Sequence, residues 1–101
     1  MLIHERQRST MLVKLSGELD HNYADRIRAE LDDLIADPSI KKLVFDMSAL
    51  SFMDSSGIGM IIGRYKLMAR RGGRVAVKCG NRRIDKIFEM AGLYQIIDKL
   101  A

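Results

Sequence analysis

The run Asp54, Ser55 and Ser56 carries the side chains best placed for chemistry, because it stands where a short apolar segment gives way to a helical pattern. Residues 42–47 before it are typical of a buried strand, and the apolar residues of 58–69 after it recur at helical spacing. Asp and Ser at a helix start accept hydrogen bonds from the unpaired N–H groups of the first turn, so simple capping is one interpretation. The other is that a serine hydroxyl at the positive end of a helix is a site for a phosphate group.

Two glycines interrupt the helix predicted after this run, and each costs about 1 kcal/mol relative to alanine in a helix interior. Gly59 and Gly63 are four residues apart, so they share one helix face with the serine pair. That face also carries two apolar side chains, those of Met60 and Leu67. We therefore predict a docking surface on which another protein could approach closely beside the serine. The alternative is that the two glycines pack against a neighbouring strand of the same domain.

Nucleotide-loop, catalytic and metal-binding interpretations are each poorly supported. A dinucleotide fingerprint would need glycine where Ile62 stands, and a P-loop would need a Gly-Lys-Ser/Thr ending. Ser55 has no base that the sequence identifies, and the nucleophile pattern Gly-x-Ser-x-Gly is missing. We therefore expect no enzyme activity, no metal ion and no cofactor. A divalent cation would require acidic residues to gather at strand ends, where they more often cap helices or stay solvated: Asp20, Asp46 and Asp54.

The composition indicates one folded domain with a mild positive charge. Of the 101 residues 48% are hydrophobic, which is enough for one core and for folding. The 17 Lys and Arg against 13 Asp and Glu leave a net charge of +4, which favours an acidic partner weakly and lacks the aromatic interleaving of a nucleic-acid platform. The one cysteine, Cys79, cannot form an internal disulfide, which fits a reducing compartment. Without a long apolar run or a signal-peptide pattern, we expect a cytoplasmic protein that contacts neither membrane nor nucleic acid directly.

The first part of the chain predicts a hairpin followed by a helix. Residues 1–5 and 10–16 are typical of two strands joined by a polar connection, with Gly17 ending the second strand. Asp20 or Asn22 then caps an amphipathic helix, which proline stops. The apolar stripe of this helix consists of Ala24, Ile27, Leu31, Leu34 and Ile35.

The rest of the chain alternates between strand and helix. Strand 42–47, the central helix, strand 74–79 and a helix closed by Gly92 follow in that order, whereas 93–100 fits either a last short strand or a docked helical tail. This order predicts an α/β fold with a mixed sheet of four to five strands, an antiparallel start, and right-handed helical crossovers packed on it. The core-facing stripe of the central helix is predicted to contain Ile58, Ile61, Ile62 and Tyr65.

Four short motifs are distinctive in combination. They are Gly-Glu-Leu-Asp at 17–20, Leu-Ser-Phe-Met-Asp-Ser-Ser-Gly-Ile-Gly at 50–59, Gly-Arg-Tyr-Lys at 63–66 and Phe-Glu-Met-Ala-Gly-Leu at 88–93. Together they resemble the bacterial anti-anti-sigma factors, or anti-sigma factor antagonists, of the STAS family, most closely those of the sporulation sigma-F system. The resemblance covers essentially the whole chain and implies a single STAS domain over 1–101.

What the resemblance implies is a phosphoprotein that regulates sporulation transcription by switching partners. In such proteins the first serine of Asp-Ser-Ser-Gly, here Ser55, is phosphorylated by the anti-sigma factor, a serine kinase with a bound nucleotide. The unphosphorylated form binds that kinase so that the sigma factor is released, and a metal-dependent serine phosphatase later regenerates it. With the glycine face included, the predicted partner-binding residues are Gly17, Glu18, Asp20, Asp54, Ser56, Gly57, Gly59, Met60 and Gly63.

Two other classes of function stay open from the sequence. A ligand- or nucleotide-binding STAS module is one, since related domains are appended to transporters and sensors. A small hydrolase that uses Ser55 is the other, although it lacks a base. For the switch itself we expect little change of fold on phosphorylation, because a helix N-terminus stabilises an anion.

Overall fold

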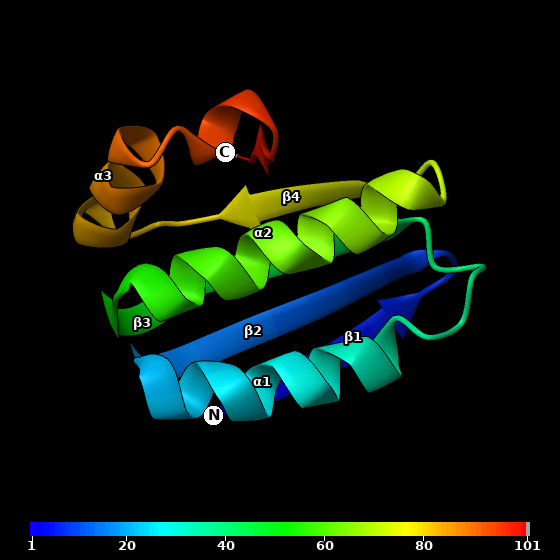
Figure 1. Cartoon of the computed structure of the whole chain (residues 1–101), viewed down its shortest axis with the longest axis horizontal. Coiled ribbons are helices and arrows are strands. Elements are labelled where there is room, and N and C mark those ends of the chain that lie inside the picture. Colours follow the sequence, from blue (N-terminus) through cyan, green and yellow to red (C-terminus); the bar gives the residue numbers. More distant parts are fainter. Residues whose placement is uncertain (101) are drawn as a thin grey trace.

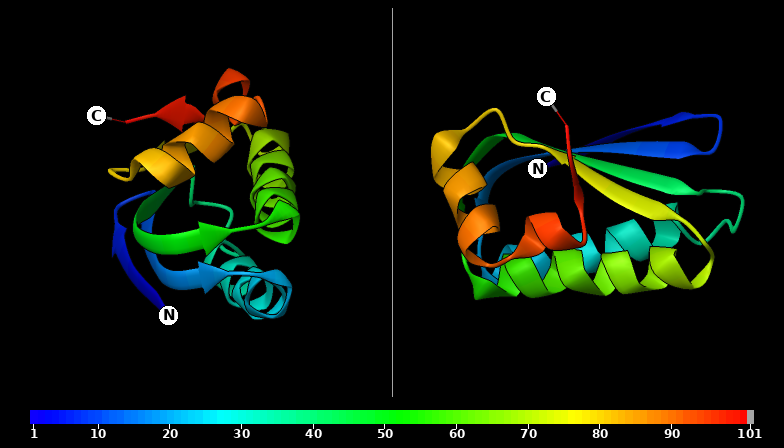
Figure 2. Two further views of the ribbon diagram at one scale, coloured as in Figure 1. Left: turned by 90° about the vertical axis from the view of Figure 1, so that its left-hand side faces the viewer. Right: turned by 90° about the horizontal axis from the view of Figure 1, so that it is seen from above.

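The computed structural model describes residues 1–100, in which helices cover one face of a five-stranded sheet (Figures 1 and 2). The strands lie in the order β1-β2-β3-β4-β5, with β1 antiparallel to β2 and the other neighbours parallel. This confirms the predicted mixed sheet with an antiparallel start. The elements are β1 (Leu2–Gln7), β2 (Thr10–Leu19), α1 (His21–Leu34), β3 (Lys42–Met53), α2 (Ser55–Arg70), β4 (Arg74–Lys78), α3 (Arg82–Met90), the 3-10 helix η1 (Leu93–Gln95) and β5 (Asp98–Lys99).

Two strands run further than their patterns predicted. β2 continues to Leu19, so the prediction that Gly17 ends it is wrong: Gly17 lies inside the strand with φ +88°. β3 continues past residue 47 to Met53. It holds one residue more than β2 at two places, between 46 and 49 and between 50 and 52, and these bulges disturb the alternation that sequence patterns depend on.

The parallel crossovers place α1 and α2 side by side and pointing the same way on one face of the sheet (Figure 1). Asp20 caps α1 by accepting a hydrogen bond from the amide of Tyr23 at 3.0 Å, which decides between the two predicted caps. The helix ends at Leu34, a short loop before Pro38. The N-termini of α1 and α2 therefore lie next to each other at the carboxyl ends of the parallel strands β2 and β3.

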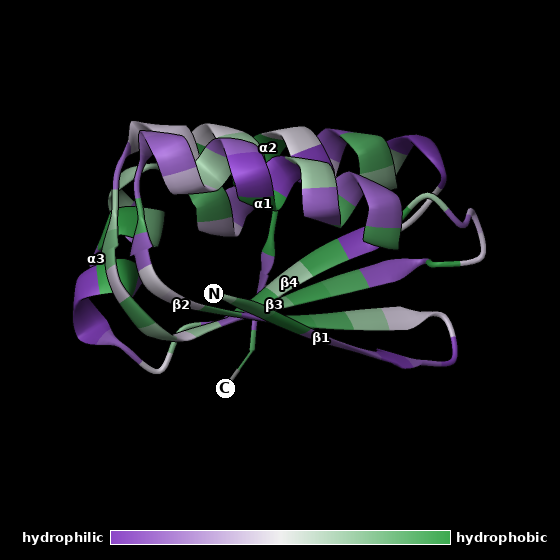
Figure 3. Ribbon diagram, turned by 90° about the horizontal axis from the view of Figure 1, so that it is seen from below, coloured by the Kyte–Doolittle hydropathy of each residue, from purple (hydrophilic) through white to green (hydrophobic). Residues whose placement is uncertain are grey.

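The core fills the space between the sheet and its helices, and the strands are hydrophobic over much of their length (Figure 3). Met11, Val13 and Leu15 of β2 point into it, as their alternation predicted. The predicted stripe of α2 is correct at Ile61 but incomplete, because α2 also packs toward α1 and buries a wider arc. Its buried residues are Gly57, Met60, Ile61, Arg64 and Met68, while Ile58, Ile62 and Tyr65 are half-buried.

The tail combines the two conformations that its sequence left open. A short 3-10 helix is followed by the two-residue strand β5, which pairs with β4. The hydroxyl of Tyr94 bonds the carboxylate of Asp85 and the thiol of the buried Cys79, which ties this tail to α3 and to the end of β4. Ala101 lies outside the described residues.

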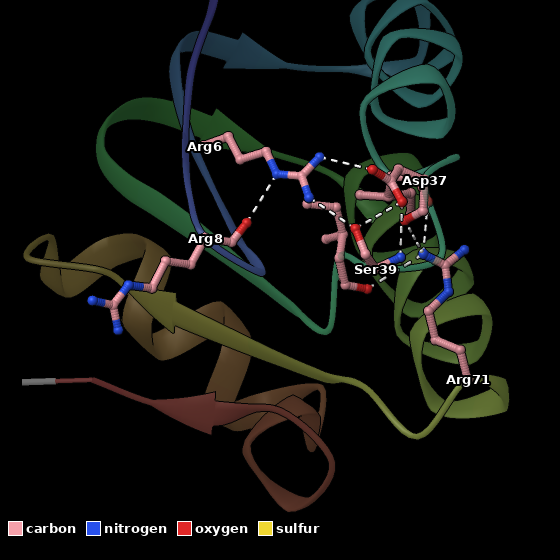
Figure 4. Close-up of polar contacts among 7 residues, drawn as sticks. Arg6, Arg8, Asp37, Ser39 and Arg71 are labelled. Atoms are coloured by element: carbon pink, nitrogen blue, oxygen red, sulfur yellow. Dashed lines mark hydrogen bonds and ion pairs between the residues drawn. The ribbon is translucent and has the colours of Figure 1, made fainter.

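A polar cluster holds the loops at the other end of the sheet, away from the N-termini of α1 and α2 (Figure 4). Arg6 donates to the carboxylate of Asp37 at 2.9 Å and to the hydroxyl of Ser39 at 2.8 Å. Arg71 at the end of α2 donates to the carbonyl of Ile35 at 2.7 Å. These contacts fasten the loop after α1 to the first hairpin and to α2. No helix within 1–100 is long and apolar enough to span a membrane.

Candidate functional site

Asp54 is the N-cap of α2, so capping is part of what the Asp-Ser-Ser run does. Its carboxylate accepts hydrogen bonds from the backbone amides of Ser56 at 2.9 Å and Gly57 at 3.3 Å. Its extended backbone and half-buried side chain are those of an ordinary cap. Asp54 therefore fixes the first turn of α2 and leaves the hydroxyls of the adjacent serines unoccupied by the cap.

The two serines differ in access. Ser55 is the first residue of α2, is exposed, and makes no side-chain hydrogen bond within the described part of the chain. Ser56 is half-buried, and its Oγ lies 3.4 Å from Nδ1 of His21, the first residue of α1. The hydroxyl of Ser55 is therefore the more available of the two to a modifying enzyme, a distinction that the residue types alone could not make.

The ends of β2 and β3 form the surface next to these serines. Gly17 and Glu18 are both exposed, and the hydroxyl of Ser51 donates to the carbonyl of Gly17 at 3.2 Å. Glu18 pairs with Phe52, whose side chain is 45% exposed although it is large and apolar. Sequence reasoning missed Phe52, because the bulges in β3 turn two successive residues, 51 and 52, outward.

The glycines of α2 have different roles. Gly57 is buried, and a Cβ there would come within 2.6 Å of Met53 Cγ and 3.0 Å of Leu19 Cδ2, so this glycine lets α2 sit close to the strand ends. At Gly59 and Gly63 an added Cβ would meet nothing within 4 Å. The alternative that these two glycines pack against a strand is therefore wrong, and they leave bare backbone on the surface of α2.

A groove of about 370 Å³ runs between α1 and α2 past these glycines. Met60 lines it but is only 5% exposed and belongs to the core, which corrects the expectation that it projects as an apolar surface residue. The groove is therefore lined by polar and apolar groups in similar measure. Its other lining residues are His21, Ala24, Asp25, Arg28, Ser56, Gly59, Gly63 and Arg64.

Arg64 is the one charged residue among 1–100 that is buried, at 7% exposed. Its Nε lies 3.2 Å from Oδ1 of Asp32, yet neither Nε nor Nη1 makes a hydrogen bond. Burial lowers the pKa of the Arg64 guanidinium, the negative charge of Asp32 opposes that shift, and the positive charge of Arg28 adds to it. The ion pair with Asp32 therefore offsets part of the free-energy cost of burying the Arg64 guanidinium.

The three aspartates considered as cation ligands each accept hydrogen bonds from a different part of the chain. Asp20 and Asp54 cap different helices, and Asp46 accepts hydrogen bonds from the amide and hydroxyl of Ser48. Across residues 1–100 no group of three or more His, Cys, Asp or Glu side chains could hold a metal ion. The contact of His21 with Ser56 also lacks the features of a catalytic pair, since it is long and the imidazole donates no hydrogen bond to a carboxylate within the described residues.

The sequence of this chain is similar to those of known proteins. Residues 2–101 match the family model described as the STAS domain. A Paenibacillus polymyxa protein named anti-sigma F factor antagonist is 41% identical over 93 residues, which cover 92% of this chain and 80% of that protein.

Solved structures share the fold. One described as the anti-sigma factor antagonist SpoIIAA in its unphosphorylated form gives a TM-score of 0.75 at 31% identity and covers 88% of this chain and 82% of that one. Another, of the Bacillus cell fate determinant SpoIIAA in the phosphorylated form, gives 0.79 at 29% identity and covers 100% and 92%. The predicted single fold of sheet and covering helices is thereby confirmed.

Proposed function

Because the chain belongs to the STAS domain family, we propose that it is an anti-sigma factor antagonist whose binding is switched by phosphorylation of Ser55. The observation that carries this proposal is the exposed hydroxyl of Ser55 at the capped N-terminus of α2. A similar solved protein is described in both an unphosphorylated and a phosphorylated form, which supports a covalent switch. The proposal includes a single domain over 1–101 and a cytoplasmic site of action.

In the proposed cycle, the unphosphorylated protein binds an anti-sigma factor that is a serine kinase with a bound nucleotide, and the sigma factor is released. The kinase then transfers a phosphate to Ser55, and a metal-dependent serine phosphatase removes it again. The regulated process is sporulation transcription. The exposed residues around the hydroxyl would form the docking surface, together with the bare backbone of α2: Gly17, Glu18, Phe52, Gly59 and Gly63.

The switch follows from charge at the interface. A phosphate on Ser55 adds about −1.5 to −2 charges, and the N-terminus of α2 tolerates an anion. The partner surface fits a neutral hydroxyl and already holds a nucleotide phosphate, so the added charge meets like charge and costs several kcal/mol of binding free energy. The fold should therefore stay the same while the affinity falls.

The test is to mix the protein with a cognate anti-sigma kinase, ATP and magnesium, and to locate added phosphate by intact and peptide mass spectrometry. Ser55→Ala and Ser56→Ala form a matched pair, since each removes one hydroxyl from the same helical turn. One phosphate that is lost only in Ser55→Ala supports the switch. Phosphate on Ser56, or transfer to both single variants, contradicts the choice of Ser55.

A ligand-binding module without a protein partner is tested in the same preparation. Titration of the isolated protein with ATP and GTP should give no saturable binding, because the proposed switch takes its nucleotide from the kinase. Tight binding of either nucleotide together with no binding of the kinase would replace the antagonist function by a sensor function.

A further inference from the structure

The solvent-facing side of α3 carries positive charges that the phosphorylation switch does not use. Arg82, Arg83 and Lys86 are all exposed, and none of them forms an ion pair with an acidic side chain within residues 1–100. At helical spacing they fall within one arc of about 100°, away from the two residues that α3 buries in the core. The three cations therefore form a single surface, which we call the α3 basic surface.

The two acidic residues of α3 do not neutralise this surface. The carboxylate of Asp85 accepts a hydrogen bond from the hydroxyl of Tyr94 and pairs with Lys99 at 3.0 Å. Glu89 shares the exposed face but lies about two turns after Arg82. The hydrogen bond to Asp85, and after it the negative charge of Glu89, raise the pKa of the Lys99 ammonium, so both acids act on that lysine. With Lys99 included, α3 keeps a net charge of +2, half of the +4 of the whole chain.

Two of the three cations stand where a helix favours them least. Asn81 caps α3 by accepting hydrogen bonds from the backbone amides of Arg83 and Ile84, so Arg82 and Arg83 are the first two residues of the helix. The free amides of a first turn give the start of a helix a partial positive charge, which stabilises acidic side chains and destabilises basic ones. The free protein gains no stability from this pair of arginines, and an anionic partner would offset their repulsion.

The α3 basic surface lies at the same end of the molecule as Ser55 (Figure 1). α3 follows β4 as α2 follows β3, and these two strands are parallel neighbours. The side-chain amide of Asn81 donates to the backbone carbonyl of Leu50 at 2.7 Å, which fixes the start of α3 against β3 two residues before Phe52. One partner can therefore contact Phe52, Ser55 and the first turn of α3 together.

We propose that the α3 basic surface docks an acidic surface of the anti-sigma partner, with Arg82 and Arg83 as the main charged contacts. The inference rests on the proposed function and assigns the attraction for an acidic partner to one helix. The contact is limited to the start of α3, so Met90, about 12 Å further along the helix, lies outside it.

The composition of this surface favours a protein partner over a membrane or a nucleic acid. Three exposed cations are fewer than the roughly four to eight that hold a polybasic segment on anionic lipid. The aromatic residue of α3, Phe88, is fully buried, so the helix has no exposed ring on which a base could stack. Arginine is enriched in protein interfaces, where it pairs with carboxylates.

The test applies the same charge reversal to two exposed arginines. Arg82→Glu acts in the α3 basic surface, and Arg8→Glu acts in the turn between β1 and β2, at the other end of the parallel strands. Both variants change the net charge of the chain equally, so only the position differs. With the rate of association with the kinase measured by stopped flow at about 50 mM salt, Arg82→Glu should slow association about 5- to 10-fold and Arg8→Glu by less than about twofold. At about 0.5 M salt the rates of both variants should converge on that of the unaltered protein, because salt screens exposed charges.

Thermal unfolding separates a lost contact from a damaged helix. Arg82→Glu replaces a cation by an anion in the first turn of α3, so its thermal midpoint should rise by up to a few degrees while its association slows. A damaged helix would lower the midpoint as well as the rate.

A third variant should act in the opposite direction. Glu89→Lys removes the acid from the exposed face of α3, so association should become about two- to fivefold faster. Glu5→Lys makes the same change on the edge strand β1 and should leave the rate unchanged. Loss of a structural contact alone would not speed association.

The outcomes separate the two proposals. If the unaltered protein does not bind the kinase, the proposed function fails and the docking contact fails with it. If it binds while Arg82→Glu and Arg8→Glu slow association alike, or while Glu89→Lys slows it, only the docking contact on α3 is wrong. Binding of random-sequence DNA or phosphatidylglycerol vesicles that Arg82→Glu abolishes, with kinase association unchanged, would also overturn it in favour of a phosphate-binding surface.

Discussion

The carboxylate of Asp54 accepts a hydrogen bond from the backbone amide of Ser56 at 2.9 Å, so the residue that starts α2 is also the neighbour of the proposed phosphate acceptor. Asp54 has two separate roles to test, capping of α2 and orientation of the serine hydroxyl, and a single substitution would change both at once. Two substitutions can separate them.

Asp54→Ala should lower the free energy of unfolding by about 1 kcal/mol, whereas Asp54→Asn should keep most of it, because asparagine also accepts from the first-turn amides. Urea unfolding measures both. The initial rate of phosphorylation of Asp54→Asn then shows whether the negative charge matters. A normal rate would leave Asp54 with capping alone.

The glycines of α2 should respond in opposite directions. Gly57→Ala forces a methyl group against Met53 and Leu19 and should cost about 1–3 kcal/mol of stability. Gly59→Ala has free space and should gain up to about 1 kcal/mol from helix propensity, measured in the same urea titrations. Because the added methyl stands on the proposed docking face, Gly59→Ala should also weaken kinase binding. A variant that is both more stable and equally tight would argue against that face.

Phe52 should matter for binding far more than for folding. It is 45% exposed beside Glu18, and large aromatic residues are common anchors of protein interfaces. Phe52→Ala is expected to weaken kinase binding at least about 10-fold while changing stability by no more than about 0.5 kcal/mol. Met90→Ala, on α3 and 79% exposed, is the matched control and should leave affinity unchanged.

Stability should fall in acid partly through Asp37. The hydrogen bond from Arg6, with further bonds from the amide and hydroxyl of Ser39, holds the pKa of Asp37 well below its usual value. A depressed folded pKa means that this contribution is complete at neutral pH and is lost as the pH falls below about 4, the unfolded value, toward the folded one.

Thermal midpoints at about pH 7 and about pH 3 should therefore differ less for Asp37→Asn than for the unaltered protein. Asp85 and Asp98 also have lowered pKa values, through Tyr94 and Arg74 respectively, so the variant keeps part of the acid sensitivity. Equal acid shifts for both proteins would show that the cluster in Figure 4 does not stabilise the fold.

The sequence predicted the fold well wherever the spacing of apolar residues stayed regular through a whole strand or helix. Alternation at Met11, Val13 and Leu15 and the helical spacing of 21–34 gave the strand and helix that the structure contains. Prediction failed in β3, where two extra residues shift the phase and turn Phe52 outward. A bulge is fixed by the partner strand, which a single run of residues does not reveal.

The residue types of the site were predictable from the sequence, but the burial of its side chains was not. Asp54 and Ser55 stand where the capping pattern placed them, whereas Met60 and Arg64 are buried because α1 packs beside α2. An arginine on a helix face is usually solvated, so its sequence position gave no sign of the groove. Only the packing of the two helices brings Arg28 and Arg64 together.

The parallel course of α1 and α2 has a thermodynamic consequence for the two forms of the protein. It sets two positive helix ends next to each other, a like-charge arrangement that the caps at Asp20 and Asp54 relieve only in part. A phosphate on Ser55 would relieve it further, by about 0.3–1 kcal/mol, or a few degrees in thermal midpoint. Under the proposed switch, the form that does not bind the kinase is then the more stable one, so heat or protease would deplete the kinase-binding form first.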